Sequence, residues 1–317
     1  MSTKIILFSY LFSLLITESI FPGIFGEELK QLLVNNYKTS STLGYNNARD
    51  IMYSEIDIKP NNQLTGVYSG YTITLDLSQD PSTNAYEQGI NCEHSWPQSL
   101  GAGSEPMKSD MHHLFPTKSN VNSSRGNDPF DDINDNLTDK WYRNEYYIET
   151  IPTSLIDEYA EKYNPPNQND ETFEPREEQK GNTARAMVYF YTMYSQQADE
   201  NFWQIQKDVL LNWNHIDPPD EEEISRTWEI ASYQQNKPNP FVVDPTLFDR
   251  VYFWQDILIG DINIDQNLDV LDLVQMITII VNQEAFSNEE LNILDANEDG
   301  SFNVLDIVVF VQTIVGE

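Results

Sequence analysis

Apolar and polar positions along the first two thirds of the chain predict many helices and few strands. Leucines and a methionine at helical spacing predict helix over residues 28–57, whereas the β-branched and aromatic stretch 66–77 favours a strand. Residues 183–197 are apolar around most of the helical circumference, which predicts a buried helix, and helix continues over residues 202–213. The polar, proline-bearing segment 163–182 predicts a loop.

Residues 83–130 mix short extended pieces with glycine and proline stops. Here "NCEHSWPQS" indicates a strand that carries Glu93 and His94 side by side, and "DMHHLF" indicates a second extended stretch. "TKSNVNSSRG" predicts a short helix, with Thr117 or Ser119 as its cap and a glycine at its end. The predicted order is therefore strand, loop, strand and helix.

The residue types in this segment suit metal-assisted hydrolysis of a phosphodiester. A side chain with a near-neutral pKa can deprotonate water, which indicates His94 as the general base. Mg²⁺ (or Mn²⁺) accepts a few oxygen ligands from a protein, and Glu93 with the amide oxygen of Asn122 would supply them. Arg125, or Arg185 from the later helix, would contact the phosphate.

Two conditions limit this hypothesis. Adjacent strand residues point to opposite faces, so Glu93 and His94 share a site only if the strand ends or bulges there, which Pro97 favours. For Arg185, a buried pair with a carboxylate is an equal alternative to phosphate contact. The aromatic run 189–194 indicates core packing rather than a platform for stacked bases.

These motifs resemble the endonuclease I family of secreted bacterial nucleases and its extracellular ribonuclease relatives. The matching pieces cover roughly residues 45–250 in family order: "CEHSWPQS", "SDMHHLFPTKSNVNSSRGN", "KGNTARAMVYFYTMY" and "QNKPNPFVVDP". The resemblance implies an α+β fold, a ββα-metal (His-Me finger) nuclease domain with many helices, over residues 27–256. It also implies His94 as base, Glu93 and Asn122 as metal ligands, and cleavage of RNA, DNA or both with little sequence specificity.

Other residues of the motifs are expected to support the ligands or contact substrate: Asp110, His112, His113 and Asn127. The chain departs from some periplasmic members at Lys108, where those members carry an acidic residue. Those members also have disulfides, which the single cysteine, Cys92, cannot form within this chain.

The last part of the chain contains an internal repeat. "DINIDQNLDVLD", residues 261–272, matches "DANEDGSFNVLD", residues 295–306, and an apolar helical run follows each copy. Positions 1, 3, 5, 7, 9 and 12 of such a loop supply oxygen ligands to Ca²⁺. Those positions are Asp261, Asn263, Asp265, Asn267, Asp269 and Asp272 in the first copy, and Asp295, Asn297, Asp299, Ser301, Asn303 and Asp306 in the second. The alternative is a pair of solvated acidic turns.

The repeat resembles a dockerin, a small all-α domain of EF-hand-like repeats, over residues 257–317. Position 6, which favours glycine, is Gly300 in the second copy but Gln266 in the first, so we expect weaker Ca²⁺ binding there. The resemblance implies a cohesin-type protein partner. The pairs Val270-Leu271 and Val304-Leu305 fall near the partner contacts of dockerins.

The net charge and the N-terminal segment indicate which surfaces the protein can bind and where it is located. The net charge of −33, from 51 acidic and 18 basic residues, argues against broad electrostatic attachment to nucleic acid or anionic lipid, although a local basic groove stays open. Lys4 and the apolar run after it predict a signal peptide over residues 1–26, with a buried N-terminal helix as the alternative. No later stretch is apolar enough to span a membrane. We therefore expect a secreted, extracellular protein, with attachment to the cell surface left open.

Three functions compete. The first is a secreted endonuclease that requires a divalent cation. The second is a non-catalytic adhesion or scaffold protein with a degenerate nuclease domain and a calcium-dependent docking module, which the presence of Glu93, His94 and Asn122 disfavours. The third, a zinc hydrolase, is disfavoured because the chain has four histidines and neither an HExxH nor a CxxC motif.

Overall fold

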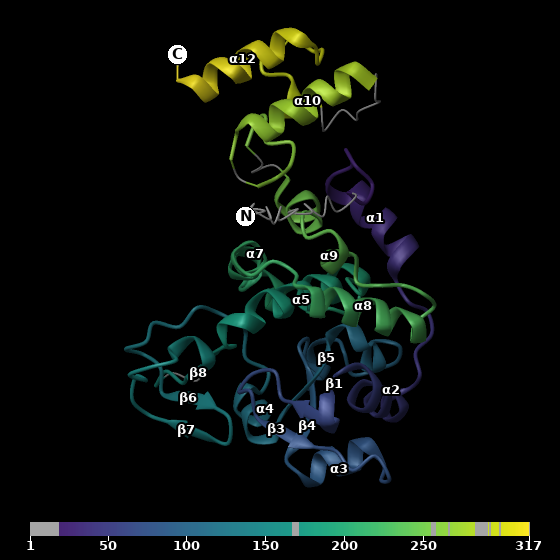
Figure 1. The fold of residues 1–317 in the computed structure, drawn as a ribbon, viewed down its shortest axis with the longest axis vertical. Helices are drawn as coiled ribbons and strands as arrows, with labels where there is room; N and C mark the ends of the chain where they lie inside the picture. Colours follow the sequence, from purple (N-terminus) through teal and green to yellow (C-terminus); the bar gives the residue numbers. More distant parts are fainter. Residues whose placement is uncertain are drawn as a thin grey trace, which may run out of the picture.

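The computed structural model describes residues 19–166, 171–254, 258–265, 267–282, 291, 293–297 and 299–316 (Figure 1). Most of the predicted signal peptide, and Gln266 of the first repeat, lie outside these residues. In the part of the chain that is described, no helix combines the length and the apolar character needed to cross a membrane.

The N-terminal elements form a helical layer and a small sheet. Helices α1 (Gly26–Tyr37) and α2 (Tyr45–Ile51) precede a π-helical turn at Met52–Ile56. The predicted helix over 28–57 is therefore interrupted, because Ser40 donates its backbone N–H to Gln235 and Gly44 has a positive φ. Strands β1 (Ile58–Lys59), β2 (Gln63–Thr65) and β3 (Thr72–Thr74) form an antiparallel sheet, followed by helix α3 (Pro81–Glu87).

The predicted strand over 66–77 is wrong for most of its length. Only Thr72–Thr74 pairs as β3, because residues 66–70 form a turn in which Gly66 donates its N–H to the Tyr71 carbonyl. Gly70 has a φ of 69°, a backbone conformation that residues with a side chain rarely adopt, and a Cβ there would also displace the Arg176 guanidinium.

Strands β4 (Ile90–His94) and β5 (Leu114–Lys118) pair antiparallel, and helix α4 (Ser119–Arg125) follows β5 directly. Gly126 ends α4 with a φ of 61°, as predicted. The predicted caps are wrong: Lys118 occupies the N-cap, because Thr117 belongs to β5 and pairs with Asn91.

A four-stranded antiparallel sheet has the order β7-β6-β8-β9 and lies to one side of α4 in Figure 1. Its strands are β6 (Lys140–Arg143), β7 (Tyr146–Ile148), β8 (Ala160–Tyr163) and β9 (Thr172–Glu174). Strand β9 lies within the predicted loop 163–182. Among polar residues in the sequence, this strand contains one core residue, Phe173. It is fully buried and packs against Tyr68, with 5.0 Å between the ring centroids.

Helix α5 (Lys180–Met193) runs through the main core, and thirteen of its residues are buried, which confirms the predicted buried helix. Around it lie α6 (Glu200–Gln204), α7 (Lys207–Ile216), α8 (Glu221–Tyr233), α9 (Pro240–Val243) and a π-helical turn at Asp249–Phe253. Trp96, just after β4, stacks on Phe190 of α5 at 5.0 Å. This contact ties the end of β4 to the core.

The C-terminal segment has its own small core. Helices α10 (Val270–Asn282) and α12 (Val304–Val315) pack through Leu273, Met276 and Phe310, and they lie at one end of the molecule in Figure 1. This arrangement agrees with the predicted pair of loop-helix repeats.

Candidate active site

Strand β4 ends at His94, so Glu93 and His94 are its last two residues. The β4–β5 ladder pairs Glu93 with Phe115 and His94 with Leu114, and no regular pairing continues past His94. Ser95 still donates its N–H to the His113 carbonyl at 3.0 Å. The two candidate residues therefore stand at a strand end, held by the buried ring of Trp96.

The Glu93 carboxylate is buried, with 2% of the residue exposed. Both of its recorded partners use one oxygen: the Tyr68 hydroxyl donates to Oε1 at 3.0 Å, and Arg125 Nη1 lies 3.6 Å from the same atom. Burial raises the pKa of Glu93 to about 7, while Arg125 and then Tyr68 act in the opposite direction. No donor to Oε2 is recorded among the described residues, so this oxygen is available to a cation.

Asn122 lies on α4, one turn before Arg125. Its Nδ2 donates to Asn91 Oδ1 at 2.9 Å and to the Cys92 carbonyl at 3.1 Å. Asn91 and Glu93 share a face of β4, so Asn122 is placed on that face too. With both amide hydrogens committed, Oδ1 has no recorded donor in the described part of the chain and can serve as a metal ligand.

Arg125 is 1% exposed and is held inside the protein. Its Nη2 donates to the Ser95 carbonyl at 2.8 Å and its Nη1 to the Gly126 carbonyl at 3.2 Å, while its guanidinium lies over the Phe130 ring. Arg125 thus joins the end of α4 to the end of β4 beside Glu93.

The His94 ring has a separate set of contacts. Its Nε2 lies 3.0 Å from the Lys108 carbonyl oxygen, which can only accept, so Nε2 carries the hydrogen. Gln98 Nε2 lies 3.3 Å from Nδ1. The ring also packs near Tyr45 and His113, and burial, followed by His113, lowers the pKa of His94 to about 3. His94 is therefore neutral, with its lone pair at Nδ1.

The structure brings Glu93, Asn122 and Arg125 together around β4 and α4. The His94 ring makes no recorded contact with Glu93 or Asn122 within the described residues, and strand alternation directs it to the other face. A reacting water would have to reach both faces at the strand end.

The neighbouring motif residues support the loop before β5. Asp110 is buried and accepts hydrogen bonds from Tyr189, Tyr194 and Gln234 side chains, at 2.9, 2.7 and 2.8 Å. Burial raises the pKa of Asp110, but nearby histidines and these donors outweigh it and hold the pKa below its usual range.

His112 and His113 are both buried, and each is bonded to a carbonyl oxygen: Nε2 of His112 to that of Lys237 at 2.9 Å, and Nε2 of His113 to that of Met107 at 2.7 Å. These bonds fix the ring orientations. Asn127, in contrast, is exposed after the end of α4.

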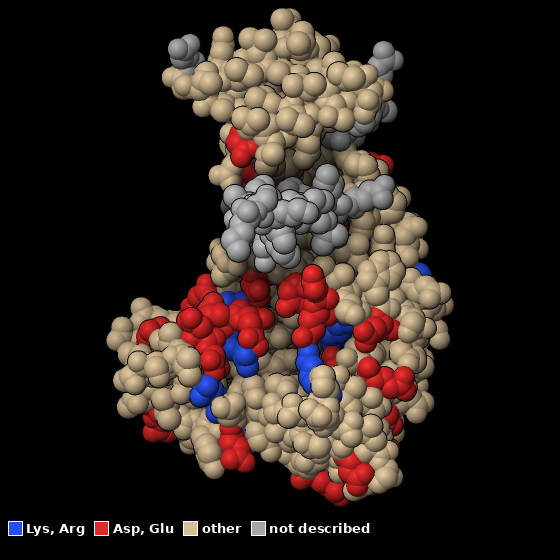
Figure 2. Space-filling view, in the orientation of Figure 1, with Lys and Arg blue, Asp and Glu red and all other residues tan. Residues whose placement is uncertain are grey.

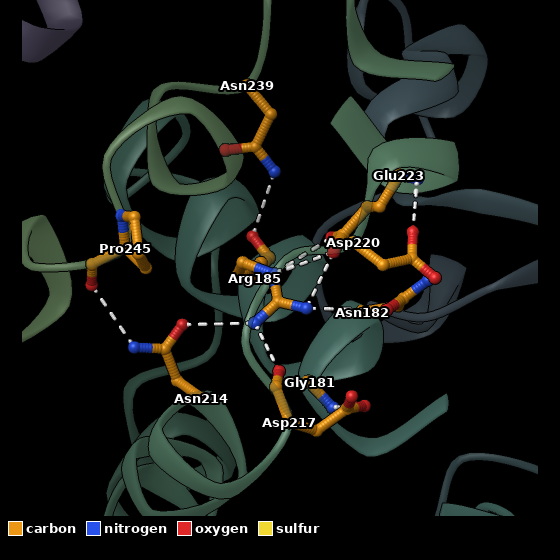
Figure 3. A network of polar contacts seen from close by, with 9 residues as sticks. All are labelled: Gly181, Asn182, Arg185, Asn214, Asp217, Asp220, Glu223, Asn239 and Pro245. Carbon is orange, nitrogen blue, oxygen red and sulfur yellow. Dashed lines mark hydrogen bonds and ion pairs between the residues drawn. The ribbon is translucent and has the colours of Figure 1, made fainter. Parts of the chain in front are cut away.

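Arg185 sits in a buried network rather than at a surface (Figure 3). Its Nε and Nη2 donate to both oxygens of Glu223, from 2.6 to 3.0 Å, and its Nη1 donates to the Asp217 carbonyl at 2.8 Å. Asn239 in turn donates to the Arg185 carbonyl. This arrangement matches the alternative of a buried arginine paired to a carboxylate.

The two repeat loops adopt matching hydrogen-bond patterns. Asp272 accepts N–H groups from Ile262, Asn263 and Asp269, and Asp306 accepts N–H groups from Asn297 and Asn303 at equivalent positions. Gly300 has a φ of 82°, which explains the glycine at position 6.

The donor set of the loops fits Ca²⁺. Asp261, Asp272 and Asp306 are buried, yet residues 255–317 contain no Lys or Arg to compensate their charge. Within the described residues, no three His, Cys, Asp or Glu side chains already converge on a metal position. The proposed sets also rely on amide and backbone oxygens.

Sequence reasoning missed two contacts of the site. Tyr68, which bonds to Glu93, lies far away in the sequence inside the stretch predicted as a strand. Gln98, which approaches His94, lies inside the motif but carries no ionisable group. Neither has a local pattern that could have indicated its role.

Comparison with known proteins decides the family. The family model for Endonuclease I matches residues 25–246, and the model for the dockerin type I domain matches residues 259–314. The chain belongs to the Endonuclease I family. Both resemblances found in the sequence are thereby confirmed.

Two curated relatives are similar to this chain. An extracellular ribonuclease of Bacillus subtilis (strain 168) is 28% identical over 249 residues, which cover 73% of this chain and 76% of the relative. An extracellular ribonuclease of Bacillus amyloliquefaciens is 29% identical over 180 residues, which cover 51% of this chain and 53% of the relative.

Proposed function

We propose that this Endonuclease I family member is a secreted endonuclease that hydrolyses phosphodiester bonds of RNA, DNA or both in a cation-dependent reaction. The observation that carries the proposal is the tautomer of His94. The Lys108 carbonyl holds the hydrogen on Nε2, so Nδ1 is the basic atom. The names of the two relatives support export and activity on RNA.

In this proposal His94 is the general base, and Glu93 and Asn122 are the ligands of the cation. His94 Nδ1 takes a proton from the attacking water. Burial keeps the ring neutral for this step, but it also lowers the pKa of His94 below the near-neutral value expected from the sequence, which makes the imidazole a weaker base. Glu93 Oε2 and Asn122 Oδ1 would hold Mg²⁺ or Mn²⁺ in the arrangement of a ββα-metal nuclease. Such a cation, when bound, polarises the phosphate and stabilises the leaving oxygen.

Arg125 positions Glu93 and the strand end, and direct contact with the phosphate would require it to leave the Ser95 carbonyl. Arg185 contributes to the fold through Glu223. Asp110, His112 and His113 support the loop that presents the Lys108 carbonyl, and Asn127 is exposed for substrate contact.

Cleavage of plasmid DNA and of RNA with Mg²⁺ or Mn²⁺ tests the proposal. We expect His94→Ala to reduce the rate by roughly 10²- to 10⁴-fold, the usual contribution of a general base. His215→Ala, at the end of α7, is the matched histidine control. Activity that survives His94→Ala refutes the base assignment, and an inactive wild type with an intact fold favours the scaffold function.

We further propose that the C-terminal module binds Ca²⁺ and docks onto a cohesin-type partner. Support comes from apolar residues left exposed at equivalent positions: Val270 and Leu271 on α10 are 62% and 56% exposed, and Val304 and Leu305 on α12 are 62% and 57% exposed. Calorimetric titration of the full chain with Ca²⁺ should show binding that Asp272→Asn and Asp306→Asn each weaken. Unchanged titrations would reject the calcium sites.

A further inference from the structure

An open hollow lies beside strand β7, and we call it the β7 hollow. Residues 70–72 line one side of it, and residues 143–148 with Tyr159 line the other. Its volume is about 660 Å³, within the range of pockets that bind small organic groups. Four of its lining residues are tyrosines: Tyr71, Tyr146, Tyr147 and Tyr159.

The tyrosines of β7 are unusually exposed. Tyr146 is 75% exposed and Tyr147 is 44% exposed, and both lie on an edge strand of the four-stranded sheet. An exposed aromatic edge invites unwanted association, which proteins ordinarily suppress. Its presence here indicates a binding role, because an aromatic ring provides a flat apolar face at low entropic cost.

Two lysines accompany these rings. Lys118 Nζ lies 3.6 Å from the Tyr71 ring centroid, and Lys140 Nζ lies 4.9 Å from that of Tyr147. In the described part of the chain neither lysine has a carboxylate within ion-pair distance, whereas Arg143 is paired with Glu158. In a protein of net charge −33, two lysines without an ion pair beside exposed rings are a local departure from the whole, and the charge of Glu145 acts on Lys118.

Two short chain segments connect the candidate active site with the hollow. Tyr68, which donates to Glu93, is followed two residues later by Gly70 at the edge of the hollow. Lys118 immediately precedes α4, which carries Asn122. A third link is the Tyr142 hydroxyl of β6, which donates to Ser124 of α4 at 2.8 Å.

On the face shown in Figure 2, Lys and Arg side chains lie in two groups in the middle, next to Asp and Glu side chains.

We propose that the β7 hollow stacks unpaired bases of the substrate strand, while Lys118 and Lys140 meet its phosphates. This inference rests on the proposed nuclease function and adds to it a binding preference for single-stranded nucleic acid. Aromatic rings stack on any unpaired base, whereas a base in a duplex has both faces covered. Stacking does not read the sugar, so RNA and single-stranded DNA share this mode of binding.

Glu145 lines the same hollow and repels phosphate. Bases rather than phosphates of a bound strand therefore lie next to Glu145. A peptide adding to the β7 edge is the competing occupant, but it would not use the lysines beside the rings.

Binding of a fluorescent single-stranded oligonucleotide and of a matched duplex tests the proposal by anisotropy, in the His94→Ala background so that neither probe is cut. We expect the double variant Tyr146→Ala/Tyr147→Ala to weaken single-strand binding by roughly tenfold or more, from about 1–3 kcal/mol per stacked base. Duplex binding should not change. Tyr146→Phe/Tyr147→Phe keeps both rings and should bind as the parent does.

Tyr86→Ala, an exposed tyrosine on α3, controls for loss of aromatic surface elsewhere. Equal losses for single strand and duplex, or no loss for either, overturn base stacking. Because binding is measured without cleavage, the result is separate from the nuclease assay: an inactive wild type rejects the proposed function, whereas an unaffected double variant rejects only the hollow.

Discussion

We call the part that matches the Endonuclease I model (residues 25–246) the body and the part that matches the dockerin model (residues 259–314) the C-terminal module. The two parts differ in how their buried carboxylates are compensated. In the body, several buried carboxylates have basic partners from the same chain, such as Glu223 with Arg185 and Glu174 with Lys180, whereas buried Asp110 is held by tyrosine and glutamine donors. In the module, Asp272 and Asp306 are buried, and no Lys or Arg follows Arg250 in the sequence. The module therefore has no Lys or Arg of its own to compensate its acidic side chains.

Removal of Ca²⁺ should produce the largest difference in stability between the body and the module. Without Ca²⁺ the buried aspartates of the module repel one another, so chelation should unfold α10 and α12 and leave the body folded. Calorimetry should show a low-temperature transition that disappears with chelator and returns with Ca²⁺, beside an unchanged body transition. Loss of both transitions together would show that the body also needs the ion.

Arg185→Met should have the next largest effect, in the body alone. It leaves Glu223 buried without a partner, which costs about 3–5 kcal/mol of unfolding free energy. Denaturant unfolding with Ca²⁺ present measures this loss. The double variant Arg185→Met/Glu223→Gln should recover part of it, and equal losses in single and double variants would argue against the pair as the cause.

The pair of His215 and Asp249 should give the smallest effect, visible as a pH dependence. The hydrogen bond to Asp249 raises the pKa of His215, and partial burial opposes it. A raised folded-state pKa means that the stabilisation is present below the unfolded pKa of about 6.5 and is lost as pH rises through the folded value. His215→Gln should make the melting temperature of the body less dependent on pH between these two values. An unaltered pH profile would contradict the stabilising role of the His215–Asp249 pair.

Local patterns predicted those elements whose residues carry their own signal. The buried helix α5 and the repeat helices follow from apolar periodicity. Two of the failures depend on a distant partner: β9 exists because Phe173 packs on Tyr68, and the break after α1 depends on Gln235. The strand over 66–77 failed for a local reason, the turn at residues 66–70.

The candidate site divides in the same manner. The identities of Glu93, His94 and Asn122, and the repeated loop ligands, are visible in the sequence because they stand in short motifs of fixed spacing. The tertiary structure decided that Tyr68 holds Glu93 and that the Lys108 carbonyl sets the tautomer of His94. It also decided that Arg185 serves the core. These roles arise from contacts between segments that only folding brings together, and hydrogen bonds across such distances leave no periodic trace in the chain.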